Sequence, residues 1–252
     1  MKRFVALLAL GLWGIGRAAS AQTVDEFGSY GTQSKDHGES PQYGAFEIRF
    51  GRYVPDVDSS VPHGTPFKDT FGDGNRYMLG LEGDWQLLRI PHLGTFGPGL
   101  GWGYTTASGL AHLSSDPSVL SGEQTSLSVM PFYLVGVLRA DVLARDYGVP
   151  IVPYGKLGVG YALWWASDGG TTANVNGVSG RGVSYGPQYA LGLMFLLDVL
   201  DEQTARDADT SIGINNSYIF GELFGSELDG FGSKTRMNVG TNSWVLGLAI
   251  EF

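Results

Sequence analysis

The chain has 252 residues, 39 of them glycine, yet only 16% of its residues are charged. This low charge and 12% aromatic content exclude a disordered chain, because disordered chains are rich in charge and poor in aromatic residues. A net charge of −9 leaves no basic surface for nucleic acid, and the absence of cysteine excludes disulfide frameworks and cysteine metal sites.

The first segment predicts a secretory signal peptide, residues 1–21. It begins with Lys2 and Arg3, continues as an apolar stretch, and ends on the small residues Ala19, Ser20 and Ala21. The apolar stretch is too short to span a bilayer as a helix. Residues 22–42 are polar and have no period, so we expect a flexible periplasmic extension before the folded domain, residues 43–252.

Alternation of apolar and polar residues with period two then predicts strands. In residues 44–54, for example, Phe46, Ile48 and Phe50 share one face, and Glu47 and Arg49 share the other. The clean segments are 44–54, 76–88, 95–105, 151–165, 184–197 and 243–252.

Two further segments, about 126–139 and 211–224, alternate less cleanly. Pro131 lies in the middle of the first and predicts a β-bulge there. In the second, Asn216 and Glu222 share parity with Tyr218 and Phe220. Either a bulge shifts the register or these two polar residues lie at the rims.

The connections alternate in length. Residues 55–75, 106–125, 166–183 and 225–237 are long and polar, residues 89–94 and 140–150 are short, and residues 198–210 form a medium link with one helical turn. This pattern is typical of an all-β fold, a single eight-stranded antiparallel up-and-down transmembrane β-barrel with long extracellular loops and short periplasmic turns. The alternative is a soluble periplasmic barrel, but eight strands enclose too little room for so many aromatic side chains.

Facing the lumen we expect a charge network that consists of Glu47, Arg49, Arg76, Glu82, Asp84, Lys156 and Glu251. Four acids and three bases are close to balance, and buried charges persist when they are paired. A salt-bridged plug that stiffens the barrel is favoured over a narrow polar path. The alternating Gly97, Gly99, Gly101 and Gly103 predict close packing on this inner face.

Other chemistry has weak support. The four histidines are scattered and offer no pair at metal spacing, so no metal and no cofactor is predicted. Asp56, Asp58, Asp69 and Asp73 in the first long loop are interpreted as solvated acids rather than a divalent-cation site. His112, Ser114 and Glu123 resemble part of a lipid A-modifying hydrolase, but they lie in a segment that reads as a loop. We therefore expect no enzyme.

The signal peptide, eight amphipathic strands and a last strand that ends in Phe resemble the small outer-membrane β-barrel proteins of Gram-negative bacteria. More narrowly, PIVPYGKLGVGYALWW, NNSYIFGELF and NSWVLGLAIEF resemble an uncharacterised barrel family of myxobacteria and related bacteria. The resemblance brings no catalytic residues. It implies that the stripe Trp244, Leu246, Leu248, Ile250 and Phe252 is read by the barrel-assembly machinery.

The resemblance also implies a place in the bacterial outer membrane and a set of partners. These are outer-membrane lipid and lipopolysaccharide, with periplasmic chaperones during biogenesis, and no nucleic acid. We expect a monomer. The favoured function is that of a structural or surface-interaction protein with a narrow charge-plugged lumen, and the alternative is a small-solute channel or transporter.

Overall fold

A computed structural model describes residues 43–113, 116–175, 177–201, 203, 205, 207, 210–211, 213–233 and 235–252. The predicted signal peptide, residues 1–21, and the predicted extension, residues 22–42, lie outside these ranges. No helix in the described ranges is long and apolar enough to cross a membrane.

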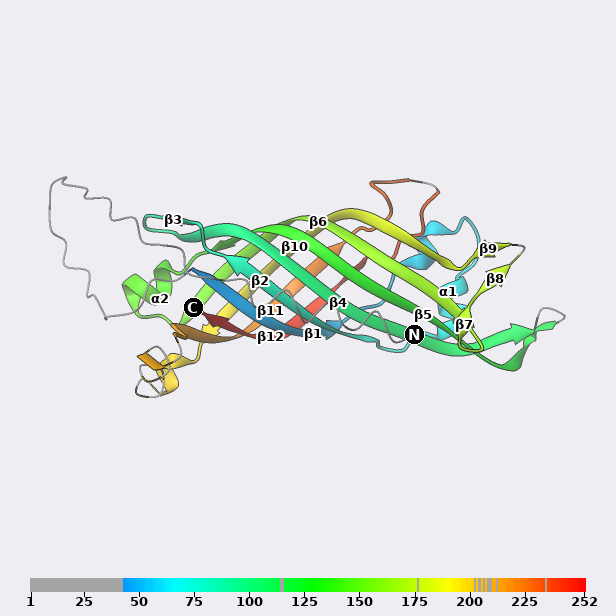
Figure 1. Ribbon diagram of the computed structural model, residues 1–252, viewed down its shortest axis with the longest axis horizontal. Coiled ribbons are helices and arrows are strands. Elements are labelled where there is room, and N and C mark those ends of the chain that lie inside the picture. The colour runs from blue at the N-terminus through cyan, green and yellow to red at the C-terminus, as the bar shows by residue number, and fades with distance from the viewer. Residues whose placement is uncertain are drawn as a thin grey trace, which may run out of the picture. The chain divides into compact units, whose positions relative to one another are not determined.

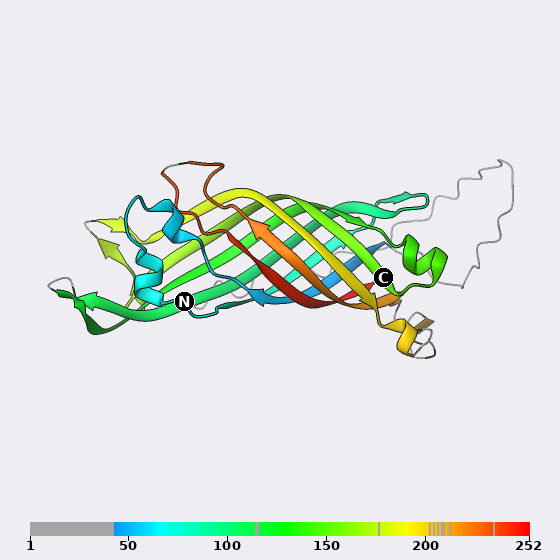
Figure 2. The same cartoon turned by 180° about the vertical axis from the view of Figure 1, so that it is seen from behind.

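Eight antiparallel strands form a closed barrel (Figures 1 and 2). Around the barrel they follow chain order: β1 Gly44–Arg52, β2 Tyr77–Trp85, β4 Gly94–Leu113, β5 Asp116–Arg139, β6 Ile151–Asp168, β10 Arg181–Leu196, β11 Asn216–Ser226 and β12 Thr241–Glu251. The last strand closes on the first, with Leu248 opposite Ile48. The predicted eight-stranded up-and-down barrel is confirmed.

The two ends of the barrel differ. At the turn end, residues 86–93, 140–150 and 197–215 connect the strands and carry β3 Leu88–Ile90, α2 Val142–Tyr147 and η2 Asp198–Leu200. At the loop end, residues 53–76, 169–180 and 227–240 carry η1 Val57–Ser60, α1 Pro66–Phe71, β7 Thr171–Thr172, β8 Asn174–Val175 and β9 Val178–Ser179. Figure 1 shows α2, β3 and the C-terminus at one end, and α1 and β7 to β9 at the other.

The loop prediction for residues 106–125 was wrong. Strands β4 and β5 continue through most of this segment and pair with each other, as in Ser108 opposite Ser126. The prediction failed because this hairpin extends beyond the barrel, where an exposed ribbon keeps its backbone ladder without an apolar stripe. The predicted loop 166–183 likewise contains the end of β6, the short strands β7 to β9 and the start of β10.

The bulge predicted at Pro131 was also wrong. Strand β5 passes Pro131 in constant register, since Phe132 lies opposite Trp102 and Val129 lies opposite Thr105. The alternation is blurred for another reason, namely that β5 turns apolar side chains inward as well as outward. Its buried apolar residues include Leu127, Val129, Tyr133, Val135 and Val137.

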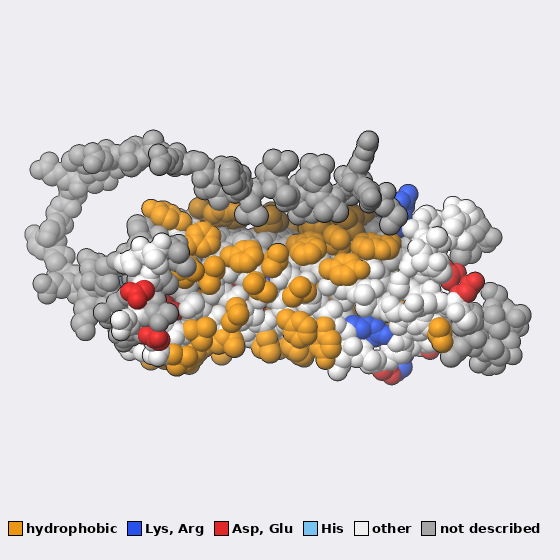
Figure 3. All heavy atoms as spheres, turned by 60° about the horizontal axis from the view of Figure 1, so that its bottom comes forward, with side chains coloured by type: hydrophobic (Ala, Val, Ile, Leu, Met, Phe, Trp, Pro, Cys, Tyr) orange, Lys and Arg blue, Asp and Glu red, His pale blue; other side chains and the backbone are white. Residues whose placement is uncertain are grey.

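The outer face of the barrel is an apolar belt (Figure 3). Large side chains that a water-soluble fold would bury are exposed on every wall, including Leu79 (59%), Leu157 (71%), Leu191 (69%) and Leu248 (54%). A continuous exposed apolar surface of this kind requires a nonpolar solvent. A closed sheet also leaves no unpaired backbone edge in hydrocarbon. The chain is therefore a membrane-spanning barrel of the outer-membrane type.

Candidate functional site

The charged side chains of the lumen form the most distinctive cluster of the described residues. Alternation along the strands turns them inward, and all are at least 95% buried. We call the following eight residues the lumen charge network: Glu47, Arg49, Glu82, Asp84, Arg139, Lys156, Glu222 and Glu251.

Glu47 lies at the centre of this network and contacts all three cations. Its Oε2 lies 2.6 Å from Nη1 of Arg49 and 2.8 Å from Nζ of Lys156. Its Oε1 lies 3.1 Å from Nη2 of Arg139. A carboxylate removed from water needs such partners, because an unpaired buried charge is strongly destabilising.

Arg49 spreads its guanidinium over three carboxylates. Besides Glu47, Nη1 lies 2.8 Å from Oε2 of Glu82, and Nη2 donates to Oε1 of Glu222. The same group lies 5.8 Å from the ring centre of Tyr133 and 5.6 Å from that of Phe220. These distances are within the range of cation–π attraction.

Arg139 forms a second centre nearer the turn end. Its Nη2 lies 2.6 Å from Oδ2 of Asp84, and its Nη1 lies 2.8 Å from Oε1 of Glu251. Glu251 also accepts hydrogen bonds from Gln86 at 2.7 Å and from Asn216 at 3.1 Å. This group ties β2, β5, β11 and β12 together.

The lumen charge network has five acids but only three bases, so its carboxylates need further hydrogen-bond donors. Buried tyrosines supply them. Tyr133 donates to Glu82 at 2.7 Å, and Tyr154 donates to Glu222 at 2.8 Å. Tyr218 donates to Glu251 at 2.9 Å. Hydrogen bonds to a carboxylate stabilise its charged form, so the phenols complete what the three cations leave open.

Six of the seven residues predicted for the lumen lie together there: Glu47, Arg49, Glu82, Asp84, Lys156 and Glu251. Arg76 does not. It lies before β2 at the loop end, where its guanidinium donates to carbonyls of Gly72, Gly74 and Phe71. It also lies 5.2 Å from the ring of Phe67. Strand β2 begins at Tyr77, so its alternation does not reach Arg76.

Sequence reasoning missed Arg139 and Glu222. Both alternatives for β11 fail at Glu222, since it lies in mid-strand in an unshifted register, opposite Gly192 and Val245. Asn216 does lie at the strand end, as the rim alternative expected. The useful signal was the shared parity of Glu222 with Tyr218 and Phe220, because all three point inward.

Glycines make room for the inward aromatic rings. A Cβ on Gly101 of β4 would lie 2.0 Å from Cζ of Tyr133, and one on Gly192 would lie 2.5 Å from Cζ of Tyr154. A Cβ on Gly247 would lie 2.4 Å from Cζ of Phe220. Each ring therefore lies against the bare backbone of a neighbouring strand, as the alternating glycines of β4 predicted.

Toward the loop end the lumen is filled by apolar side chains. The apolar layer comprises Tyr53, Val129, Phe224, Leu228, Val239 and Val245, all at most 3% exposed. Tyr53 follows β1 and donates its hydroxyl to the carbonyl of Val239 at 2.7 Å. Burial raises the pKa of the Tyr53 phenol well above its usual range, so the hydroxyl remains a donor.

Metal and hydrolase chemistry find little support in the geometry. Oxygens of Glu47, Glu82 and Asp84 lie within 4.8 Å of one another, but these carboxylates are occupied by Arg49, Arg139 and Lys156. In the hydrolase-like group, His112 lies in β4, a strand rather than the predicted loop, and Ser114 lies outside the described residues.

The stripe predicted as an assembly signal faces outward from β12 and its end. Trp244, Leu246, Leu248 and Phe252 are 40–54% exposed, and Ile250 is half-buried. Their recognition by the assembly machinery remains a prediction.

Comparison with known proteins gives a likeness of fold. No protein-family model matches the chain, and no curated protein matches it. Solved structures do, among them the outer membrane protein OprG from Pseudomonas aeruginosa (15% identity, 84% of this chain and 97% of that chain, TM-score 0.47). A second is Ail, the attachment invasion locus protein of Yersinia pestis, in complex with a heparin analogue (15% identity, 84% of this chain and 100% of that chain, TM-score 0.44). A third is Neisserial surface protein A (13% identity, 86% of this chain and 100% of that chain, TM-score 0.42).

Proposed function

We propose that this chain is an outer-membrane protein whose closed barrel holds an ordered surface outside the cell without conducting solutes. Its function is then structural or one of surface interaction. The observation that carries the proposal is the double closure of the lumen. The lumen charge network occupies one part, and the apolar layer of Tyr53, Leu228 and Val239 fills the part toward the loop end.

The loop end supports a role at the surface. Residues 53–76 and 227–240 are joined by hydrogen bonds from Asp56 N to Gly240 O at 2.9 Å and from Asn238 N to Ser60 Oγ at 2.6 Å. Between these loops lies a polar hollow of about 340 Å³, lined in part by Ser59, Asp229 and Arg236. A preformed hollow on joined loops suits the contact of a partner, because little ordering is needed on binding.

Conductance of the purified protein in planar bilayers tests the proposal. We expect no steady current above that of protein-free bilayers, because the apolar layer and the buried, ion-paired side chains of the lumen charge network fill the lumen in series. The Val239→Ser variant is the control. It disturbs the packing of the apolar layer but keeps the lumen charge network, so it shows how much current local disruption of packing alone causes. A steady current from the unaltered protein whose ion selectivity changes in Lys156→Glu would overturn the proposal in favour of a channel.

We also propose that the stripe on β12 is used in assembly with periplasmic chaperones and the barrel-assembly machinery, and that the product is a monomer. Insertion of Phe252→Ala into vesicles that contain the purified machinery should be several-fold slower. Insertion of Phe46→Ala, which alters an outward aromatic residue of the neighbouring strand, serves as the control. Equal rates for the two variants would contradict the assembly role.

A further inference from the structure

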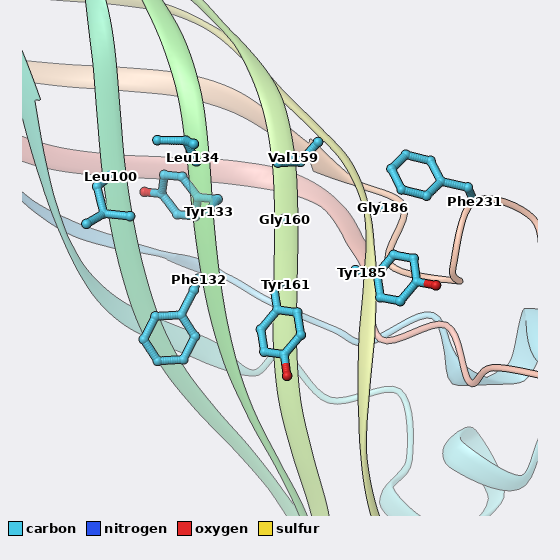
Figure 4. Close-up of a pocket in the computed structure, with 10 residues that line it drawn as sticks. All are labelled: Leu100, Phe132, Tyr133, Leu134, Val159, Gly160, Tyr161, Tyr185, Gly186 and Phe231. Atoms are coloured by element: carbon cyan, nitrogen blue, oxygen red, sulfur yellow. The ribbon is translucent and has the colours of Figure 1, made fainter.

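An apolar groove of about 410 Å³ lies on the outer face of the barrel across β4, β5, β6 and β10. Its walls are outward side chains of neighbouring strands, including Leu100, Leu134, Val159, Tyr161 and Tyr185, and the backbone of the paired Gly160 and Gly186 adds to the lining. Figure 4 shows the rings of Phe132, Tyr161 and Tyr185 on three successive strands. The groove is part of the membrane-facing belt, so its natural contents are hydrocarbon.

Phe231 limits the groove toward the loop end. It comes from the loop between β11 and β12, is 63% exposed, and its ring centre lies 5.9 Å from that of Tyr185 (Figure 4). The loop is anchored beside β10 by a hydrogen bond from Gly230 N to Tyr185 O at 2.7 Å. Phe231 has a φ of 59°, a conformation that side chains other than glycine rarely adopt. The loop therefore holds an aromatic ring at the end of the groove at some cost in backbone energy.

A cation lies directly beside this end of the groove. The guanidinium carbon of Arg236 lies 4.7 Å from the ring centre of Tyr185, and Nη1 donates to Val183 O at 2.9 Å. Among the residues that the structure describes, no carboxylate lies within 4.0 Å of this guanidinium. Arg181, the first residue of β10, is exposed at the same end of that strand. Arginine without an acidic partner, fixed against an aromatic ring, suits recognition of a phosphate.

We propose that this groove seats an acyl chain of one lipopolysaccharide molecule of the outer leaflet, with Arg236 contacting a phosphate of its lipid A. From the apolar belt toward the loop end, the apolar groove is followed by the ring of Phe231 and then by the cation of Arg236. A lipid A molecule has the same order, with its acyl chains in the membrane and its phosphates at the surface. The inference rests on the proposed function, in which the loop end faces outward.

The amount of lipopolysaccharide that stays bound to the purified protein tests the proposed site. Protein purified in mild detergent is mixed with rough-type lipopolysaccharide, with the same lipid lacking its lipid A phosphates, or with phosphatidylglycerol. Native mass spectrometry then counts bound lipids. We expect one retained lipopolysaccharide per barrel, and at least about tenfold less of the other two lipids.

Two variants address the two halves of the site. Arg236→Gln removes the cation, and Val159→Trp fills the groove; each should lower retention of lipopolysaccharide about tenfold. Their controls lie on the opposite wall, where Arg52→Gln and Leu248→Trp make the same changes on β1 and β12 and should leave retention unchanged. All four barrels are checked for folding by their heat-dependent gel mobility.

Equal retention by site and control variants would overturn the inference, and so would retention of phosphatidylglycerol or of the phosphate-free lipid at the level of lipopolysaccharide. This failure is distinct from failure of the proposed function. A conducting barrel contradicts the proposed function and leaves lipid retention as it is, since no residue of the groove variants belongs to the lumen charge network.

Discussion

The carboxylate of Glu47 and the ammonium of Lys156 lie 2.8 Å apart although their strands, β1 and β6, face each other across the barrel. Three strands lie between β1 and β6 in either direction around the sheet. The ion pair is thus a tie across the lumen between walls that share no backbone hydrogen bond. Glu82 on β2 and Glu222 on β11 extend this tie, at 2.7 and 3.8 Å from the same ammonium.

Replacing Lys156 by methionine should destabilise the barrel by about 3–5 kcal/mol, because three buried carboxylates lose a shared cation. Adding Glu47→Gln to this variant should recover part of the loss, since one unpaired charge disappears. Urea unfolding in detergent micelles measures both. A double variant that is as unstable as the sum of the two single variants would contradict a direct Glu47–Lys156 interaction.

Gly101→Ala should destabilise the barrel by roughly 1–3 kcal/mol, because the new methyl group occupies the position of the Tyr133 ring. In a Tyr133→Ala background the same change should cost much less. The unfolding free energies of the four proteins form a cycle that measures this coupling. Gly83→Ala on β2 is a suitable control, since its Cβ would meet its nearest neighbour only at 3.9 Å.

Tyr53→Phe removes the hydroxyl that donates to Val239 O and should cost about 1 kcal/mol. Tyr53→Ala should cost about 3–5 kcal/mol, because it leaves a cavity in the apolar layer. Thermal unfolding, followed by the change in gel mobility, measures the loss of stability in each of these two variants. If Tyr53→Ala were no worse than Tyr53→Phe, the packing role assigned to this ring would be wrong.

Leu248→Arg should cost about 2–4 kcal/mol, since Leu248 lies in the apolar belt opposite Ile48 and Ile219. Val178→Arg is the control, because Val178 is even more exposed, at 72%, but belongs to β9 at the loop end. Reversible unfolding from lipid vesicles measures the difference. Equal costs at the two sites would mean that the belt does not face lipid.

The strand pattern predicted the barrel because its physical cause is local. In β1, the faces of Phe46, Ile48 and Phe50 on one side and Glu47 and Arg49 on the other follow from pleating alone. The inward-facing partners of those charges are harder to identify from the sequence. Arg139 and Glu222 come from strands whose inner faces are also apolar, so the contrast between faces that guided the other assignments is lost.

The full length of β4 and β5 could not be predicted from the sequence for a different reason. Beyond the belt, both faces of a ribbon meet polar surroundings, and period-two alternation disappears while the ladder continues. Arg76 shows the reverse error. Its parity matches the inner face of β2, but the strand begins at Tyr77, and parity has no meaning once the chain leaves the sheet.

The lumen charge network also fixes which strands meet at which residues. Sliding one strand by two positions would keep its outward side chains in lipid and its inward side chains in the lumen, so the belt alone accepts several alignments. The network does not, because such a slip would carry Glu47 away from Lys156 and Arg139 and leave buried charges without ion-pair partners. Specificity of alignment, rather than strength of association with the membrane, is then the main contribution of these eight side chains, and their loss should yield barrels that insert but close out of register.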